Sequence, residues 1–414
     1  MAHDAPSAAP TRISADPTVR RLAGANFVST LGNGLTMTLS ALYFTQVVRI
    51  PVAHVGLALT VAGMFGVAAS IQFGPIVDRL GSRRVMTLLL VGSAVCSASL
   101  GLLHSFWPFL AVITATSVVS SGASTARATL YSHALPPEAR TQARAFLRAV
   151  TNVGIGAGSA LAAVALHLGT REAYVTAFLA DALTFLAAAA ILRGLPTHYA
   201  PDAPERGTRR GRNPALRDRP YLAVAALNAV LSLQFSIFEV GIPLWIVRHT
   251  DAPRVMVAVS MVINTVLVAL FQVRAGRLVR DVGTAARLAR RGGLILAAAW
   301  LILGLCAGLP GWLAAVLVGT ALVVETAGEV ITSAAGWELS YGLADDANAG
   351  AYQGVFQGGF STATMAGPVV VTSTALHFGF VGWALLAAIF AAAGATLPPV
   401  ARWAAAQRTA RTGG

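Results

Sequence analysis

Four acidic side chains stand inside long apolar stretches of the sequence. Glu325 and Glu329 are four residues apart, which puts both on one face if their stretch is helical. Asp181 and Glu239 lie in two other apolar stretches. A charge at the centre of a bilayer costs ~2.5–3.5 kcal/mol on insertion scales, so such residues are candidates for function. Two carboxylates in a low-dielectric cavity repel each other, so one of the glutamate pair is expected to hold a proton near neutral pH, as a proton-coupling site requires.

The composition as a whole is that of a membrane protein. Hydrophobic residues make up 56% of the 414 positions and charged residues only 11%, with a mean hydropathy of +0.67. A soluble chain carries about 25% charged residues. One helical span needs ~20 residues to cross ~30 Å of hydrocarbon, so twelve spans would use roughly 240 residues and fit this length. The composition therefore excludes a soluble protein.

The apolar stretches form two sets of six. We predict spans at 21–48, 53–77, 84–104, 107–133, 143–168 and 172–193, then at 220–247, 254–278, 291–309, 311–337, 348–377 and 380–403. Ten or eleven spans are the alternative, because only short turns separate some runs. We predict an all-α membrane protein with twelve transmembrane helices in two six-helix bundles, typical of transporters built from repeats. Its predicted parts are a tail at 1–20, a half at 21–193, a connector at 194–219, a half at 220–403 and a tail at 404–414.

The arginines indicate the orientation. No lysine occurs, and with twelve spans all but five of the 30 basic residues fall on one side of the membrane. Arg140, Arg144 and Arg148 are counted there, in the cytoplasmic segment around the start of the fifth run. Arg-rich loops stay in the cytoplasm, so we predict a multi-pass plasma-membrane protein with both termini cytoplasmic. The arginines lie between apolar runs and not on one polar face with interleaved aromatics, which argues against a nucleic-acid partner.

The loop between the second and third runs carries a motif. It reads G-P-I-V-D-R-L-G-S-R-R over residues 74–84, and it resembles the signature G-x-x-x-D-R-x-G-R-R of the major facilitator superfamily. It departs at Ser82, which moves the arginine pair one place on. The corresponding loop of the second half, residues 276–283, repeats the glycine spacing but has Arg280 in place of the aspartate. The resemblance and the layout of two six-span halves imply the major facilitator fold.

The resemblance also implies a cytoplasmic latch. Gly74 would let two helices approach closely, and Asp78 would face the positive N-terminus of a neighbouring helix. The loop arginines would pair with carboxylates across the seam between the halves, meet anionic lipid, or act only as topology signals. Arg127 would pair with Asp78 or extend to the lipid headgroups. The implied latch residues are Gly74, Asp78, Arg79, Gly81, Arg83, Arg84 and Arg127.

The resemblance further implies a central cavity lined by the first, fourth, seventh and tenth spans. Glu239, Glu325 and Glu329 therefore rank above Asp181 for proton coupling, and Asp181 could instead make a packing hydrogen bond near Thr184. An anion site needs an inward-facing arginine, and none is evident, so apolar walls with carboxylates favour amphipathic, often cationic, molecules. Amides that could line the cavity, or simply bond a neighbouring helix, are Asn33, Asn228, Gln234, Asn264 and Gln357.

These features predict a secondary active transporter working by alternating access. We favour a proton-coupled exporter of amphipathic drug-like or secondary-metabolite molecules, similar to the drug/proton antiporters. That branch's pattern is incomplete, because Val118 stands where an arginine would precede Gly122 and the fifth run has no proline. The alternative is a proton-coupled or facilitated importer of a sugar or an organic acid. An integral membrane enzyme is less favoured, since no metal or nucleophile pattern occurs; we expect no cofactor, a monomer, and small-molecule substrate, protons and lipid bilayer as partners.

Overall fold

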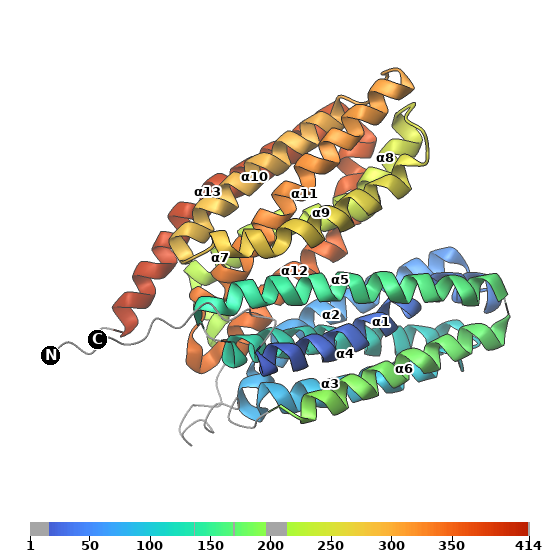
Figure 1. Ribbon diagram of the computed structural model, residues 1–414, viewed down its shortest axis with the longest axis horizontal. Helices are drawn as coiled ribbons and strands as arrows, with labels where there is room; N and C mark the ends of the chain where they lie inside the picture. Colours follow the sequence, from blue (N-terminus) through green and yellow to red (C-terminus); the bar gives the residue numbers. More distant parts are fainter. Residues whose placement is uncertain (1–15, 136, 169, 196–212, 413–414) are drawn as a thin grey trace.

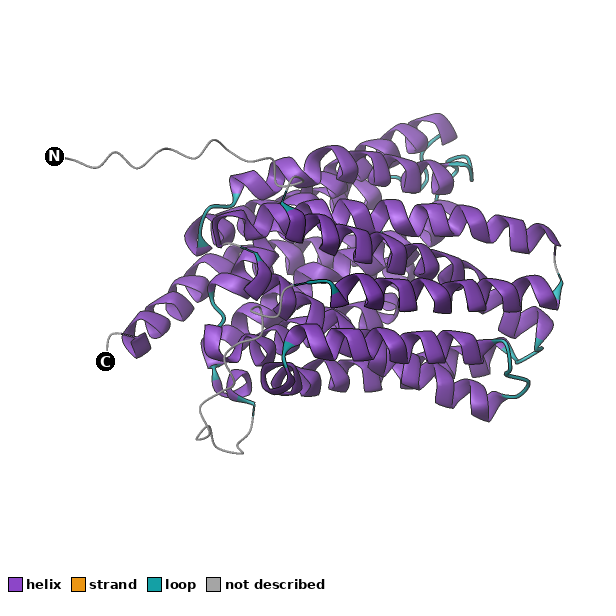
Figure 2. Cartoon of the chain, turned by 60° about the horizontal axis from the view of Figure 1, so that its bottom comes forward, coloured by secondary structure: helices purple, strands orange, loops and turns teal. Residues whose placement is uncertain are grey.

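The computed structural model describes residues 16–135, 137–168, 170–195 and 213–412 (Figure 1). Helices and short connections make up these residues, and no strand occurs among them (Figure 2). The predicted tail at 1–20 and connector at 194–219 therefore lie largely outside the described residues. The first helix begins at Pro17 and the last helix ends at Thr412, so helices include parts of both predicted tails.

Six long helices form each half of the chain. In the first half they are α1 (Pro17–Leu42), α2 (Val52–Leu80), α3 (Ser82–Leu100), α4 (Phe106–Ala134), α5 (Pro137–Leu168) and α6 (Arg171–Arg193), with a π-helical turn η2 (Tyr43–Val47) after α1. In the second half they are α7 (Arg219–Ser236) continued by η5 (Ile237–Gly241) and α8 (Ile242–His249), α9 (Met256–Leu278), α10 (Val282–Gly304), α11 (Gly311–Gly342), α12 (Ala349–Val371) with the π-helical turn η7 (Thr372–Leu376), and α13 (Phe380–Thr412). Short 3₁₀ helices, η4 (Pro214–Arg217) and η6 (Asp346–Asn348), precede α7 and α12.

The π-helical turn η5 between α7 and α8 has a local cause. Pro243 lies in the first turn of α8, directly after the π-helical turn η5. Proline lacks an N–H group, and its ring would clash with the carbonyl four residues earlier in a regular α-helix. A wider π-helical turn removes that clash, so α7, η5 and α8 run on as one helix from Arg219 to His249.

Among the described residues, nine helices are long and apolar enough to cross a membrane: α2 to α6, the α7–α8 helix, α9, α11 and α13. The other three long helices, α1, α10 and α12, are more polar. In α10 the reason is three arginines in its first half, Arg287, Arg290 and Arg291. The twelve predicted runs therefore correspond to twelve long helices, of which nine have an unambiguous membrane-spanning composition.

Several helices reach beyond the predicted apolar runs. Helix α5 begins at Pro137 and α10 at Val282, although the runs begin at 143 and 291. Proline is favoured in the first turn of a helix, and Asp281 caps α10 by accepting the Thr284 N–H at 2.7 Å. Such signals set where a helix starts, whereas hydropathy marks only the part that meets lipid.

The two halves have separate apolar cores. Buried apolar residues of 215–404 form one cluster and those of the first half form two, and Tyr341 of the second half belongs to one of the first-half clusters. Figure 1 shows the halves as two bundles, blue to green and yellow to red. Hydrogen bonds join the halves where α2 ends and α12 begins, and where α11 ends and α5 begins. We call this the Arg-rich end, because the arginine-bearing loops lie there; the ribbons of α5 and α9 diverge toward the opposite end.

Glycines allow α1 and α5 to pack closely in the first half. A Cβ atom added at Gly158 would clash with the Leu31 carbonyl oxygen, and one at Gly34 would clash with the Ile155 carbonyl oxygen. By contrast, a Cβ atom added at Gly156 of α5 would meet no atom within 4 Å. Small residues of this kind let membrane helices pack backbone to backbone.

We predict that Gly158→Ala destabilises the protein by about 1–3 kcal/mol, because a backbone atom of α1 must move to admit the methyl group. The matched control is Gly156→Ala, two residues away, which should leave stability unchanged or raise it by ~0.5–1 kcal/mol. Thermal unfolding of the purified protein in detergent measures both. Equal melting temperatures for the two variants would contradict the close packing of α1 and α5.

Candidate functional site

The first contact between the halves joins Asp78, near the end of α2, to the start of α12. Its two carboxylate oxygens accept the Gly350 N–H at 2.6 Å and the Ala351 N–H at 2.8 Å. These N–H groups belong to the first turn of α12. The N–H groups of a first turn have no partner within the helix, and they form the positive end of the helix dipole. A Cβ atom added at Gly74 would lie 2.5 Å from the Gly350 carbonyl oxygen, so α2 and α12 approach closely here.

The other residues of the loop motif stay within the first half or face outward. Gly81 has a φ of 85°, a conformation that favours glycine, at the turn between α2 and α3. Arg83 donates to the carbonyl oxygens of Arg193 and Leu195 at the end of α6. Arg79 and Arg84 are exposed. Of the predicted latch residues in this motif, Asp78 therefore bonds to the second half, and Gly74 packs closely against it.

Arg127 takes neither of the two positions predicted for it. It donates to the Asn26 side-chain oxygen at 3.2 Å and lines a cavity beside α1 and α5. The helical repeat explains this: Thr125 faces α2, where it donates to the Ser70 carbonyl oxygen, and a residue two positions later points about 200° away from it. The prediction that Arg127 pairs with Asp78 or extends to headgroups is wrong.

The second contact between the halves joins α5 to α11. Thr141 donates to a Glu338 carboxylate oxygen at 2.7 Å, and Arg144 donates to the Tyr341 hydroxyl. The guanidinium of Arg144 also lies 5.5 Å from the Trp337 ring centroid. Together with the Asp78 contact, these bonds close the Arg-rich end of the interface.

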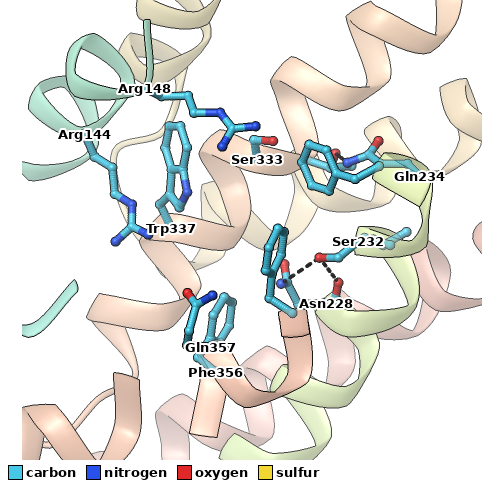
Figure 3. Close-up of a pocket in the computed structure, with 13 residues that line it drawn as sticks. Arg144, Arg148, Asn228, Ser232, Gln234, Ser333, Trp337, Phe356 and Gln357 are labelled. Atoms are coloured by element: carbon cyan, nitrogen blue, oxygen red, sulfur yellow. Dashed lines mark hydrogen bonds between the residues drawn. The ribbon is translucent and has the colours of Figure 1, made fainter. Parts of the chain in front are cut away.

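A cavity of about 120 Å³ lies between the halves, just inside these contacts (Figure 3). Arg144 and Arg148 reach it from α5, and the α7, α11 and α12 helices supply the other walls. Figure 3 shows the Arg148 guanidinium beside Ser333, with Trp337 between the two arginines. The complete lining is Arg144, Arg148, Asn228, Leu231, Ser232, Gln234, Phe235, Thr332, Ser333, Trp337, Phe356, Gln357 and Phe360.

A second cavity of about 130 Å³ adjoins the first on the side of the first half. It shares Arg144, Arg148 and Trp337 with the first cavity and adds Arg127 and Asn26. Three arginines therefore line the two cavities, and no aspartate or glutamate is among the described residues that line either one. The expectation that no arginine faces inward is wrong.

Arg144 and Arg148, which the arginine count assigns to the cytoplasmic side, lie inside helix α5, and both line the cavity. Arg148 is eleven residues past the first residue of that helix, which corresponds to about 16 Å of rise. Pro137, a helix-start residue, is the sequence signal that places both arginines beyond the first turn of the helix. Their spacing of four residues puts them on one face, toward the second half.

Three of the five predicted amides line the first cavity: Asn228, Gln234 and Gln357. Asn264 lies elsewhere, between α9 and α11, where its side-chain N–H donates to Glu329 at 2.7 Å. Asn33 is exposed and lines none of the cavities described above. The amide-lined wall thus belongs to α7 and α12 of the second half.

The glutamate pair of α11 is deeply buried. Glu325 is 0% exposed and Glu329 is 6% exposed. Asn264 donates to Glu329, the Thr326 hydroxyl lies 3.3 Å from Glu325, and one Glu325 oxygen has no hydrogen-bond partner among the described residues. Thr332 and Ser333, which line the cavity, follow Glu329 by about one helical turn. The pair is therefore next to the cavity and not in its wall.

The other two acidic candidates differ from this pair. Glu239, in η5, is exposed. Arg148 lies close enough to interact electrostatically with both Glu239 and Glu329. Asp181 is buried inside the first half, where it accepts the hydroxyls of Thr36 at 2.6 Å and Ser97 at 2.7 Å. Asp181 lines none of the cavities described above.

A larger cavity of about 440 Å³ lies nearer the opposite end, between α2, α4 and α12. Hydroxyl groups are prominent in its lining: Thr60, Ser117, Ser121, Ser361 and Thr364. It contains no charged residue among the described residues that line it. Charge is therefore concentrated in the two cavities near the Arg-rich end.

Two six-helix halves with polar cavities at their interface define a multi-pass membrane transport protein. A family model for the Major Facilitator Superfamily matches residues 22–368. The chain belongs to the Major Facilitator Superfamily, and its fold is that of a secondary transporter.

Solved structures of the same fold cover nearly the whole chain. The human organic anion transporter MFSD10 (TETRAN) is 17% identical with a TM-score of 0.70, covering 92% of this chain and 98% of that one. A bacterial homologue of the iron transporter ferroportin in an outward-facing state is 13% identical with a TM-score of 0.74, covering 96% and 100%. The transporter FucP in the outward conformation is 15% identical with a TM-score of 0.70, covering 95% and 99%. No curated protein matches this sequence.

Proposed function

We propose that this protein is a proton-coupled transporter that exports amphipathic small molecules by alternating access. The observation that carries the proposal is the cavity between the halves, closed at the Arg-rich end and adjacent to the buried Glu325–Glu329 pair. A transporter needs a binding site at the interface of two bodies that move against each other. Proton coupling needs a buried group that gains and loses a proton as the bodies move.

Coupling also needs a physical connection between the cavity and the carboxylates, and Arg148 supplies one. It lines the cavity and interacts electrostatically with Glu329. A ligand bound at Arg148 would change the electrostatic field at Glu329, and protonation of Glu329 would change the affinity of Arg148 for the ligand. Such reciprocity is required of any two linked binding events.

The proposed orientation has the Arg-rich end in the cytoplasm of the cell, with both termini on that side and the protein in the plasma membrane. The arginine asymmetry of the loops supports it. With this orientation the cavity is sealed from the cytoplasm by the Asp78, Thr141 and Arg144 contacts. Asp78, Gly74 and the α5–α11 contacts then form the cytoplasmic gate.

A second candidate is proton-coupled import of a small organic acid. Arg144 and Arg148 in the cavity wall favour it, because guanidinium groups bind carboxylates. The two candidates share a fold, a cavity and a coupling site, and they differ in the direction of net movement.

Accumulation in intact cells distinguishes the two directions. We expect energised cells that produce the protein to accumulate less anilinonaphthalene sulfonate, an amphipathic fluorescent probe, than cells that produce Glu329→Gln. A protonophore should remove the difference. Greater accumulation than in the variant cells would support import, and equal accumulation with and without the protonophore would contradict proton-coupled transport of this probe.

A further inference from the structure

We infer that the cavity between the halves binds the acidic group of an amphipathic organic anion, a carboxylate or a sulfonate, at Arg148, with the apolar part of the molecule against aromatic side chains of α7, α11 and α12. This inference rests on the proposed function, because it names the charge class of the molecule that is transported.

The first observation is the charge of the cavity walls. Arg127, Arg144 and Arg148 line the two adjoining cavities, and no carboxylate lies among their described lining residues. Like charges repel strongly where water is partly excluded. A cationic amphipath would therefore be repelled by the arginines of the cavity walls, whereas an anionic one would be attracted to them.

The second observation is that Arg144 is already engaged in the gate. Its guanidinium lies 5.9 Å from the Tyr131 ring centroid, 5.5 Å from that of Trp337 and 5.3 Å from that of Tyr341. It also donates to the Tyr341 hydroxyl. Aromatic faces stabilise a guanidinium without neutralising its charge. The Arg144 side chain is therefore held in place in the cavity wall, and it adds to the positive potential in the cavity.

Arg148, one turn further along α5, is differently placed. Its guanidinium lies 5.6 Å from the Phe235 ring centroid and extends into the cavity beside Ser333 (Figure 3). Within the described part of the chain it forms no ion pair. Glu239 and Glu329 act on it only at longer range. Its N–H donors can therefore form two parallel hydrogen bonds to two oxygens of a carboxylate or a sulfonate.

The third observation is the remainder of the wall. Phe235, Trp337, Phe356 and Phe360 present aromatic surface next to Arg148. The two adjoining cavities of about 120 and 130 Å³ are each close to the ~150 Å³ that holds a benzene ring in a protein core. An acidic group attached to an aromatic or alicyclic ring system matches both the charge and the space.

Two roles of Arg148, as a counter-charge or as a binding group, predict different effects of its loss on ligand binding. If Arg148 served only as a counter-charge to Glu329, its loss would affect charged and uncharged ligands alike. If it binds the acidic group, its loss affects only ligands that carry that group. A pair of ligands that differ by the acidic group alone therefore separates the two roles.

Anilinonaphthalene sulfonate and N-phenylnaphthylamine form such a pair, because they share one ring skeleton and only the first carries a sulfonate. Binding of each to the purified full-length protein, in a neutral detergent without anionic lipid, is measured by energy transfer from tryptophan. We expect wild type to prefer the sulfonate. Arg148→Gln should weaken sulfonate binding by about 10- to 100-fold and leave the neutral compound within about twofold, as loss of a charge-assisted hydrogen-bond pair predicts.

Two further variants serve as controls. Arg274→Gln removes the same charge from an exposed position of α9 outside the cavities and should bind both compounds like wild type. Arg148→Lys keeps the charge without the two-pronged geometry and should retain part of the preference for the sulfonate. Unchanged binding of the neutral compound shows in every case that the protein is folded.

Equal binding of the two compounds by wild type, or equal weakening of both by Arg148→Gln, overturns the inference. The proposed function fails separately. Loss of the proton dependence of transport with this binding pattern intact would end the coupling claim alone. Proton-coupled transport of the neutral compound with no preference for the sulfonate would end the anion claim alone.

Discussion

We expect Glu329→Gln and Glu325→Gln each to reduce substrate-driven proton movement to the level of protein-free liposomes. Both side chains are buried on one face of α11, and Asn264 holds Glu329 in place. Glutamine has nearly the same shape as glutamate, but its amide neither gains nor loses a proton near neutral pH. The cavity wall begins about one helical turn away, so substrate binding should survive the change.

The measurement uses proteoliposomes with a trapped pH-sensitive dye, to which anilinonaphthalene sulfonate is added. Glu172→Gln is the matched control, because Glu172 is exposed in the first turn of α6, far from α11 in the chain and in the other half. It should behave like wild type. Full proton movement in both α11 variants, with the probe still bound, would remove α11 from the coupling mechanism.

The second large effect is expected from Asp78→Asn, which should slow turnover by about 10- to 100-fold. The carboxylate of Asp78 accepts two N–H groups from the first turn of α12, at 2.6 and 2.8 Å. Asparagine keeps one acceptor oxygen and presents an NH₂ donor to the other N–H. A hydrogen bond to a charged group contributes about 1.5–3 kcal/mol, and 1.4 kcal/mol corresponds to a factor of ten in an equilibrium.

The expected cause is a gate that no longer closes fully, so equilibrium binding of anilinonaphthalene sulfonate should change by no more than about threefold. Initial rates of probe uptake into proteoliposomes measure turnover. Asp281→Asn is the control: Asp281 occupies the related loop of the second half, where it caps α10, and asparagine caps a helix equally well. Wild-type turnover in Asp78→Asn would contradict the gate assignment.

The helical layout could be predicted from the sequence because it depends on a local property. A segment that crosses lipid must be apolar along its whole length, so each span is marked by its own residues. The predicted run 172–193 and helix α6, Arg171–Arg193, illustrate this agreement. Helix ends were predicted less well. Pro137 and Asp281 start their helices outside the apolar runs, where capping and not hydropathy decides.

The composition of the cavity could be predicted only in part, because it depends on which face of each helix meets the other half. Asn228, Gln234 and Gln357 face the cavity, whereas Asn264 has the same chemistry but faces Glu329. The direction of Arg127 toward Asn26 is set by the packing of α4 on α2, which turns the Thr125 face of α4 toward α2. Neither distinction has a local sequence signal, since both depend on contacts between residues about 60 or more positions apart.

The position of Arg148 in the cavity wall has a related cause. Arginines near the end of a predicted span are expected to signal topology, and Arg148 lies five residues after the start of the predicted run 143–168. What the run does not show is that the face of α5 with Arg148 meets the second half and lines the cavity. For this reason the substrate that we propose is anionic, whereas the sequence alone favours a cationic one.

The central claim is that a proton gradient drives transport through this cavity. Its most direct test imposes a pH difference across proteoliposomes, with the membrane potential clamped and equal anilinonaphthalene sulfonate on both sides. The sulfonate stays ionised, so pH alone does not redistribute it. An acidic lumen should concentrate the probe inside by up to about tenfold for each pH unit and proton exchanged, and an alkaline lumen should expel it. A distribution that stays equal under both gradients, in protein that binds the probe, would contradict proton-coupled export.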